Sequence, residues 1–141
     1  PTRRFTQGEI QSMAEDSRYV TLYGRLADKF GDNGVVSVAA GEIRGDSLDI
    51  ILWLMSCRVL KRDMEYAMMD QLARRCRELG LRTLVGYYFP TAKNGMVREF
   101  YAGQGFTRIS QEQDGSTVWR LDLENYEKKN HVITIESTEK E

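Results

Sequence analysis

The sequence predicts a single mixed α/β domain in which helices pack on one sheet. Helix-like and strand-like segments follow in the order helix, three strands, helix, strand, helix, two strands. The pairs Asn33-Gly34 and Asp114-Gly115 are hairpin signals near the two ends of this order. The run 50–55 is apolar on both faces, which is typical of a central strand. Hairpins therefore surround a βαβ-like middle, and the sheet should contain both parallel and antiparallel strands.

Length and composition fit one ordinary globular domain. The chain has 141 residues, of which 41% are hydrophobic, and a net charge of −1. We expect one domain over 1–141, with a core over about 3–123 and a C-terminal tail over 124–141. The charge balance favours neither nucleic acid nor an anionic membrane as a partner. No stretch reaches the roughly 18 apolar residues of a membrane span. Two cysteines are too few for a disulfide framework, so we expect a reducing, cytoplasmic setting.

The first half of the chain contains one predicted helix and three predicted strands. Thr6 and Glu9 form a capping box, which starts a helix over 7–15. Alternating side chains over 19–26 indicate a strand. Asn33-Gly34 then turns the chain into a returning strand over 35–43. The turn 44–47 leads to the apolar strand 47–55.

The second half begins with the clearest helix. Apolar side chains recur every three or four positions from Met64 to Leu79, and Gly80 ends the helix. A strand over 82–89 ends at Pro90. After a short helix, strands over 107–111 and 117–123 flank the turn at Asp114-Gly115. Residues 124–130 are polar and turn-like, and 131–135 can form an edge strand.

The segment 94–106 reads as a short helix with a defined end. Asn94 can cap its first turn, and Gly105 suits a left-handed residue after its last. Phe100 and Tyr101 share the apolar face. This order of residues resembles the last helix of the GNAT acyltransferase superfamily. The resemblance implies that Tyr101 faces an acyl thioester of coenzyme A type and donates a proton to the leaving thiolate. The competing interpretation is that Tyr101 is a core aromatic residue.

The turn 56–63 is the second candidate site. It precedes a helix N-terminus, where free amides suit a pyrophosphate, and it carries Arg58, Lys61 and Arg62. The GNAT superfamily uses a turn with this position, but its two glycines are absent here, and Asp63 is a good helix cap. A solvated basic turn therefore remains an alternative to cofactor binding. The cofactor-binding residues that we predict are Met55, Arg58, Val59, Lys61, Arg62 and Asn94.

The remaining polar residues give weaker signals. Cys57 ends the central strand beside Arg58 and is a candidate nucleophile, although free cysteines are more often buried. We place Cys76 in the core. The sequence shows no cluster of His, Cys and carboxylate residues with metal-ligand spacing, and we predict no metal. Three carboxylates lie near the central strand, Glu42, Asp46 and Asp49, and the GNAT resemblance implies that one in this region can act as base for an amine. Turn formation and solvation account for all three more simply.

Several segments resemble a narrower family, the FkbH-like proteins of HAD-superfamily subfamily IIIC. The specific ones are 28–34 (DKFGDNG) and 56–60 (SCRVL), and the resemblance spans roughly 3–123. It implies that this chain is the GNAT-like C-terminal part of a longer protein, with an HAD domain in cis that supplies the phosphatase aspartates and magnesium site. Asp46 and Asp49 lack the Asp-x-Asp spacing of that site.

The resemblance implies an acyltransferase-like function in polyketide biosynthesis. The domain would handle a glyceryl-type thioester with an acyl carrier protein, and phosphopantetheine or coenzyme A would enter between Met55 and the strand 84–89. Tyr101 would face the sulfur, and Cys57 would be an acyl acceptor or a structural thiol. The first alternative is a free-standing acyl-CoA N-acyltransferase. The second is a non-catalytic module that docks the carrier protein or braces the HAD domain.

Overall fold

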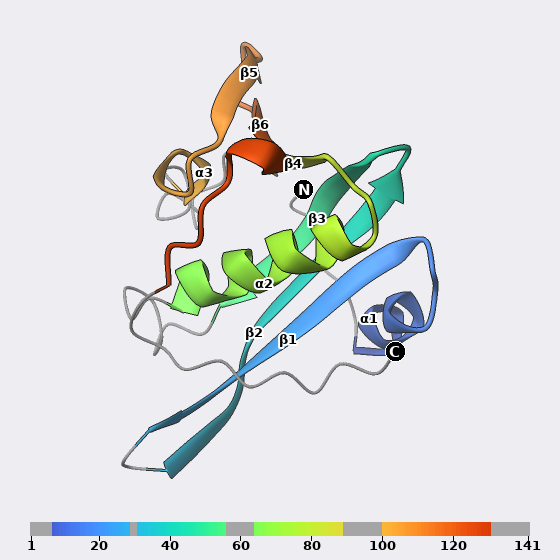
Figure 1. Ribbon diagram of the computed structural model, residues 1–141, viewed down its shortest axis with the longest axis vertical. Coiled ribbons are helices and arrows are strands. Elements are labelled where there is room, and N and C mark those ends of the chain that lie inside the picture. The colour runs from blue at the N-terminus through green and yellow to red at the C-terminus, as the bar shows by residue number, and fades with distance from the viewer. Residues whose placement is uncertain (1–6, 29–30, 56–63, 89–99, 131–141) are drawn as a thin grey trace.

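One six-stranded sheet forms the body of the protein. The computed structural model describes residues 7–28, 31–55, 64–88 and 100–130. The strand order is β1-β2-β3-β4-β6-β5, and only β3 and β4 pair in parallel (Figure 1). This confirms the predicted mixed sheet with hairpins at both ends. The elements are α1 (Gln7–Ala14), β1 (Tyr19–Asp28), β2 (Gly31–Arg44), β3 (Ser47–Met55), α2 (Met64–Glu78), β4 (Thr83–Tyr88), α3 (Phe100–Gly103), β5 (Thr107–Gln111), β6 (Thr117–Asp122) and the 3₁₀ turn η3 (Leu123–Asn125).

The first hairpin is longer than its sequence signal predicts. Asp28 pairs with Gly31, so the prediction of a turn at Asn33-Gly34 is wrong, and this pair lies inside β2. The glycine of the pair has a φ of 72°. It lies where the β1–β2 register shifts, between Arg25 and Ala27 on the opposite strand. A positive φ is a feature of β-bulges as well as of tight turns, which is why the pair misled the prediction.

Helix α2 forms from the predicted apolar stripe. Its buried residues include Met64, Met68, Leu72 and Cys76, which recur at four-residue intervals. Leu79, which the pattern also places on the stripe, is 49% exposed because the helix ends at Glu78. Gly80 follows with a φ of 77°, as expected for the residue that ends a helix.

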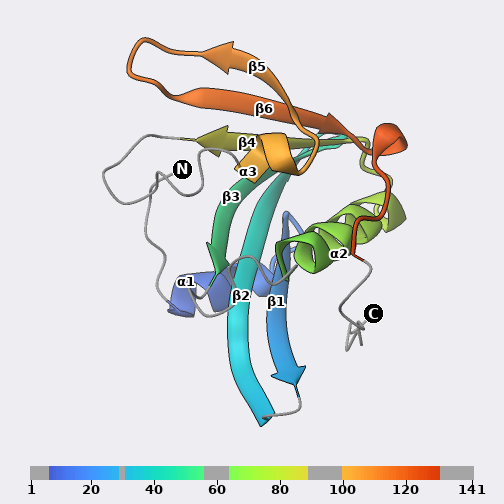
Figure 2. The same ribbon diagram turned by 90° about the vertical axis from the view of Figure 1, so that its left-hand side faces the viewer.

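The two faces of the sheet are covered differently. Figures 1 and 2 show α2 and α3 on one face and α1 on the other. On the α2 face, Leu48, Leu84 and Leu72 belong to one buried cluster. On the α1 face, Met13 packs against Ala40 and Leu52 at the side of the sheet formed by β1 to β3. Apolar burial on both faces accounts for the central place of β3.

The central strands β3 and β4 separate part of the way along their length. They pair at Ser47–Thr83, Leu48–Leu84 and Asp49–Val85, and no later pair forms between the two strands. Beyond this point the strands diverge (Figure 2). The β2–β3 register shifts just after this point, at Ile51, and a bulge bends a strand and increases its twist. We call the position where Asp49 and Val85 form the last pair the fork.

The chain after β6 is part of the packed body. Asp70 on α2 is buried and accepts hydrogen bonds from the Tyr126 hydroxyl and from the amides of Lys129 and Asn130. Tyr126 and Asn130 are themselves 6% and 4% exposed. Within 124–130, Tyr126 and Asn130 are thus buried and hold the segment against α2, whereas the sequence pattern ends the core at 123. The predicted edge strand 131–135 lies outside the described residues. None of the described helices is long and apolar enough to cross a membrane.

Candidate functional site

Beyond the fork, no described strand pairs with the β3 edge that faces β4. From Ile50 to Met55, β3 is paired only with β2 among the described strands. Backbone amides and carbonyls on its other edge are strong hydrogen-bonding groups that can pair with an extended ligand. The sequence predicts an entry for a phosphopantetheine arm between Met55 and the strand that follows α2. The two strands do part at this place.

Tyr101 lies at the fork on the α2 face. A Cβ built on Gly86 of β4 would come within 2.3 Å of the Tyr101 ring, so the ring rests directly on the strand backbone. Its neighbours are Phe106 and Trp119, with ring centroids at 5.1 and 6.4 Å. Burial raises the pKa of the Tyr101 phenol to about 12, although a hydrogen bond with the backbone of Tyr87 opposes this shift. Tyr101 is therefore a core aromatic residue that keeps its proton near neutral pH, and its role as a proton donor stays a prediction.

A second set of polar groups lies at the fork on the opposite face. The Tyr87 hydroxyl donates a hydrogen bond of 3.2 Å to Asp49, and Arg44 Nε lies 3.3 Å from the same carboxylate oxygen. Arg44 also pairs with Glu42 at 2.6 Å. Burial, followed by the charge of Asp49 and the hydrogen bond, raises the pKa of Tyr87. Asp49 is only 9% exposed, so the expectation that solvation accounts for it is wrong.

Two residues of the fork, Gly86 and Tyr87, and a third beyond it on β3, Trp53, were not predicted from the sequence. Gly86 allows the approach of Tyr101, and an isolated glycine within a strand was an available signal for such an approach. Tyr87 and Trp53 look like ordinary strand residues in sequence. The contact of Tyr87 with Asp49 depends on the register between β3 and β4, and the contact of Trp53 with Phe100 depends on where α3 packs, and no local pattern encodes either.

Most of the predicted cofactor-binding residues cannot be placed. Met55 is half-buried and packs against the cluster of Val36 and Met64, beside the start of α2. The other predicted residues lie outside the described residues, as does the predicted nucleophile; they are Cys57, Arg58, Val59, Lys61, Arg62 and Asn94. Their roles stay predictions. In the described ranges, no group of three or more His, Cys, Asp or Glu residues could hold a metal ion.

Cys76 is a core residue, as predicted. It is fully buried, and desolvation raises the pKa of its thiol to about 12. We therefore expect the variant Cys57→Ser, whose single thiol is Cys76, to be inert to Ellman's reagent at pH 8 until it is unfolded by urea. Free thiol is measured by the absorbance of the product that the reagent releases. Rapid reaction of the folded variant would contradict the burial of Cys76.

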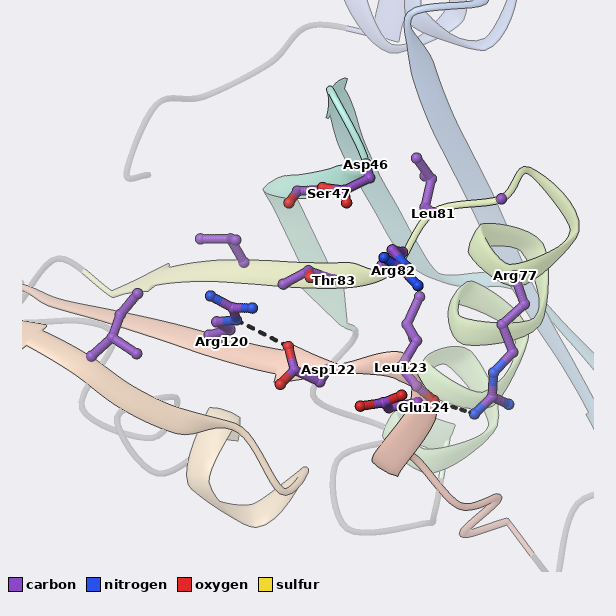
Figure 3. Close-up of a pocket in the computed structure, with 13 residues that line it drawn as sticks. Asp46, Ser47, Arg77, Leu81, Arg82, Thr83, Arg120, Asp122, Leu123 and Glu124 are labelled. Atoms are coloured by element: carbon purple, nitrogen blue, oxygen red, sulfur yellow. Dashed lines mark hydrogen bonds and ion pairs between the residues drawn. The ribbon is translucent and has the colours of Figure 1, made fainter.

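The described residues also line a cleft of about 710 Å³, which lies at the other end of the central strands. It borders Ser47 and Thr83, the first residues of β3 and β4. Arg120 in this cleft pairs with Asp122 at 3.0 Å, and both side chains are labelled in Figure 3. The guanidinium of Arg77 is bonded to backbone carbonyl groups after β6. These charges are satisfied within the protein, and the cleft reaches from the first residues of β3 and β4 to Val85, while Met55 does not line it.

Comparison with known proteins identifies the fold. No protein-family model and no curated protein matches the sequence. Among solved structures, the chain is similar to the ribosomal-protein-S18-alanine N-acetyltransferase of Escherichia coli, with a TM-score of 0.64 and 14% identity over 93% of this chain and 85% of that one. The GNAT domain of PAT from S. lividans has a TM-score of 0.65 and 18% identity, with coverages of 84% and 70%.

A further solved structure contains coenzyme A. It is an aminoglycoside 6′-N-acetyltransferase complexed with coenzyme A, with a TM-score of 0.62 and 9% identity over 80% of this chain and 77% of that one. At these identities the likeness shows the fold alone. The predicted fold class is confirmed: the chain has the mixed sheet of the GNAT acyl-CoA N-acyltransferases, with helices packed on it.

Proposed function

We propose that this chain binds the phosphopantetheine arm of an acyl thioester between β3 and β4 and transfers the acyl group to an acceptor. The parting of β3 from β4 after Asp49 and Val85 carries this proposal. The arm is extended and bears amides, so it can pair with the free edge of β3 as an added strand would. The thioester would then lie at the fork, where Tyr101 and Asp49 approach from opposite faces.

The two faces of the fork provide the acid and the base of the reaction. Asp49 would accept a proton from the acceptor nucleophile as it attacks the carbonyl carbon. The carbon–sulfur bond then breaks, and Tyr101 would donate its proton to the departing thiolate. Tyr87 and Arg44 hold the Asp49 carboxylate in place. One proton thus passes from the nucleophile to Asp49, and another passes from Tyr101 to the sulfur.

For the source of the thioester, we propose an acyl carrier protein with a glyceryl-type acyl group, as in the FkbH-like proteins. The resemblance of 28–34 and 56–60 to that family supports this choice. So does the loss of the glycines from the turn 56–63, because coenzyme A has a pyrophosphate whereas a carrier-bound arm ends in a single phosphodiester. An HAD domain in cis is part of the same proposal.

A free-standing N-acyltransferase that uses acyl-CoA is the second candidate. The likeness to N-acetyltransferases, one of them complexed with coenzyme A, favours it. Titration of the chain with coenzyme A and with phosphopantetheinylated carrier protein separates the two. Preference for the carrier supports the first candidate, and tight binding of coenzyme A that Arg58→Ala abolishes supports the second. If neither ligand shifts an NMR resonance or the melting temperature, the acyl-transfer proposal is wrong.

Replacement of Tyr101 tests the chemistry. We expect Tyr101→Phe to slow acyl transfer by about 100-fold, which is the lower range for loss of a general acid. Affinity for the arm and the unfolding midpoint should change little, because the ring stays on Gly86. The rate is measured by release of free thiol from the acyl donor. Tyr23, which is 50% exposed on β1, gives the matched control Tyr23→Phe. A Tyr101→Phe enzyme with the wild-type rate would remove Tyr101 from the mechanism.

A further inference from the structure

The indole of Trp53 lies on the part of β3 that has diverged from β4, and it contacts α3. Trp53 lies on β3, beyond the last pair with β4, and belongs to the partly buried residues on the α2 face. Its ring centroid is 4.9 Å from that of Phe100, the first residue of α3, and the two rings are tilted by 49°. Phe100 in turn lies edge-on to Tyr101 at 5.4 Å. Trp53 is therefore a side chain of the diverging part of β3 that packs on α3, the helix that carries Tyr101.

The Trp53 indole N–H is buried without a hydrogen-bond partner among the described residues. An indole N–H is a donor only, and buried donors are nearly always paired, so an unpaired one requires an explanation. The other tryptophan of the chain follows this rule. Trp119 Nε1 donates to the hydroxyl of Thr117 at 2.8 Å. The unpaired donor thus belongs to the tryptophan on β3, beside the proposed ligand path, whereas the donor of the tryptophan on β6 is satisfied within the protein.

We propose that Trp53 Nε1 donates a hydrogen bond to an amide carbonyl of the bound phosphopantetheine arm. This inference rests on the proposed function. Trp53 lies four residues beyond Asp49, which is roughly 13 Å along a strand. If the thioester lies at the fork beside Asp49, Trp53 is too far along β3 to reach the thioester carbonyl. It is instead level with the amides of the arm. A carbonyl there would satisfy the donor that the protein leaves unpaired.

A pair of matched variants tests this role. Trp53→Phe keeps an aromatic ring beside Phe100 and removes the donor, and Trp119→Phe removes a donor that is already paired within the protein. We expect Trp53→Phe to weaken binding of coenzyme A about fivefold to tenfold, which is the usual effect of one hydrogen bond. Trp119→Phe should leave this affinity unchanged. Calorimetry measures both affinities, and thermal melts show whether each variant is folded.

The choice of ligands locates the contact. The affinity of Trp53→Phe for phosphopantetheinylated carrier protein should fall by the same factor as its affinity for coenzyme A, because the two ligands share the arm. Adenosine 3′,5′-bisphosphate has the nucleotide of coenzyme A without the arm, and its affinity should not change. In Trp119→Phe, Trp53 is the single tryptophan. Its fluorescence should respond to coenzyme A and not to the bisphosphate.

The outcomes separate this inference from the function on which it rests. If wild-type protein binds neither coenzyme A nor the loaded carrier, the proposed function fails and the role of Trp53 fails with it. If wild-type protein binds and Trp53→Phe binds equally well, only the role of Trp53 is overturned. Should Trp53→Phe fold poorly, benzothienylalanine at position 53 keeps the bicyclic ring and lacks the N–H, and the same loss of affinity is expected.

Discussion

Gly86→Ala is expected to displace Tyr101 from the fork and to destabilise the protein. The new methyl group would lie 2.3 Å from Cε1 and 2.4 Å from Cζ of Tyr101, far inside van der Waals contact. Tyr101 is buried among Phe106 and Trp119, so its ring cannot move without disturbing them. We expect a loss of about 1–3 kcal/mol in the free energy of unfolding, which is typical of overpacking. Acyl transfer should fall at least as far as in Tyr101→Phe. Urea unfolding and the transfer assay measure the two effects.

Gly103→Ala is the matched control for Gly86→Ala. Gly103 is the last residue of α3, and a Cβ there would meet no atom within 4 Å. An alanine in a helix is favoured over glycine by up to about 1 kcal/mol, so the control should be neutral or slightly stabilised. Equal stabilities and rates for the two variants would show that Tyr101 does not rest on the backbone of β4.

Asp70→Ala should strongly destabilise the protein. The buried carboxylate accepts from the Tyr126 hydroxyl, from the amide of Lys129 at 3.0 Å and from the amide of Asn130 at 2.9 Å. Its removal takes away the acceptor of these three hydrogen bonds in a site where Tyr126 and Asn130 are buried. We expect a loss of about 3 kcal/mol, since leaving a buried donor without its partner costs about 1–3 kcal/mol. The free energy of unfolding in urea measures this loss.

Tyr126→Phe distinguishes the effect of the hydrogen bonds to Asp70 from the effect of packing of the Tyr126 ring. This variant loses a single hydrogen bond to Asp70 and keeps its buried ring, so a smaller loss of about 1 kcal/mol is expected. Hydrogen exchange should show the amides of Lys129 and Asn130 protected in Tyr126→Phe and exposed in Asp70→Ala. An Asp70→Ala protein within about 1 kcal/mol of the wild type would contradict a structural role for this carboxylate.

Local patterns predicted the elements of this fold well. The stripe from Met64 to Cys76 became α2, and the apolar run after Ser47 became the central strand. Both follow from the period of the apolar side chains, which the backbone geometry of one element imposes. The failure at Asn33-Gly34 has the same origin. The pair does adopt a positive φ, but only the β1–β2 register decides whether such a residue makes a turn or a bulge.

The candidate site was predictable only in part. Tyr101 and the entry beside Met55 were predicted from the resemblance to the GNAT superfamily, and their roles in binding and catalysis stay predictions. The partners Gly86, Tyr87 and Trp53 were not, because they meet Tyr101, Asp49 and Phe100 through contacts across the sheet.

The sequence by itself determined the order of elements, their approximate bounds and the class of fold, since these depend on neighbouring residues. Tertiary structure alone decided where β3 and β4 part, which face each polar group occupies, and that Asp49 and Asp70 are buried rather than solvated. Such features arise when residues far apart in the chain come into contact. Trp53 is an example, since only the folded chain shows that its N–H is buried and unpaired.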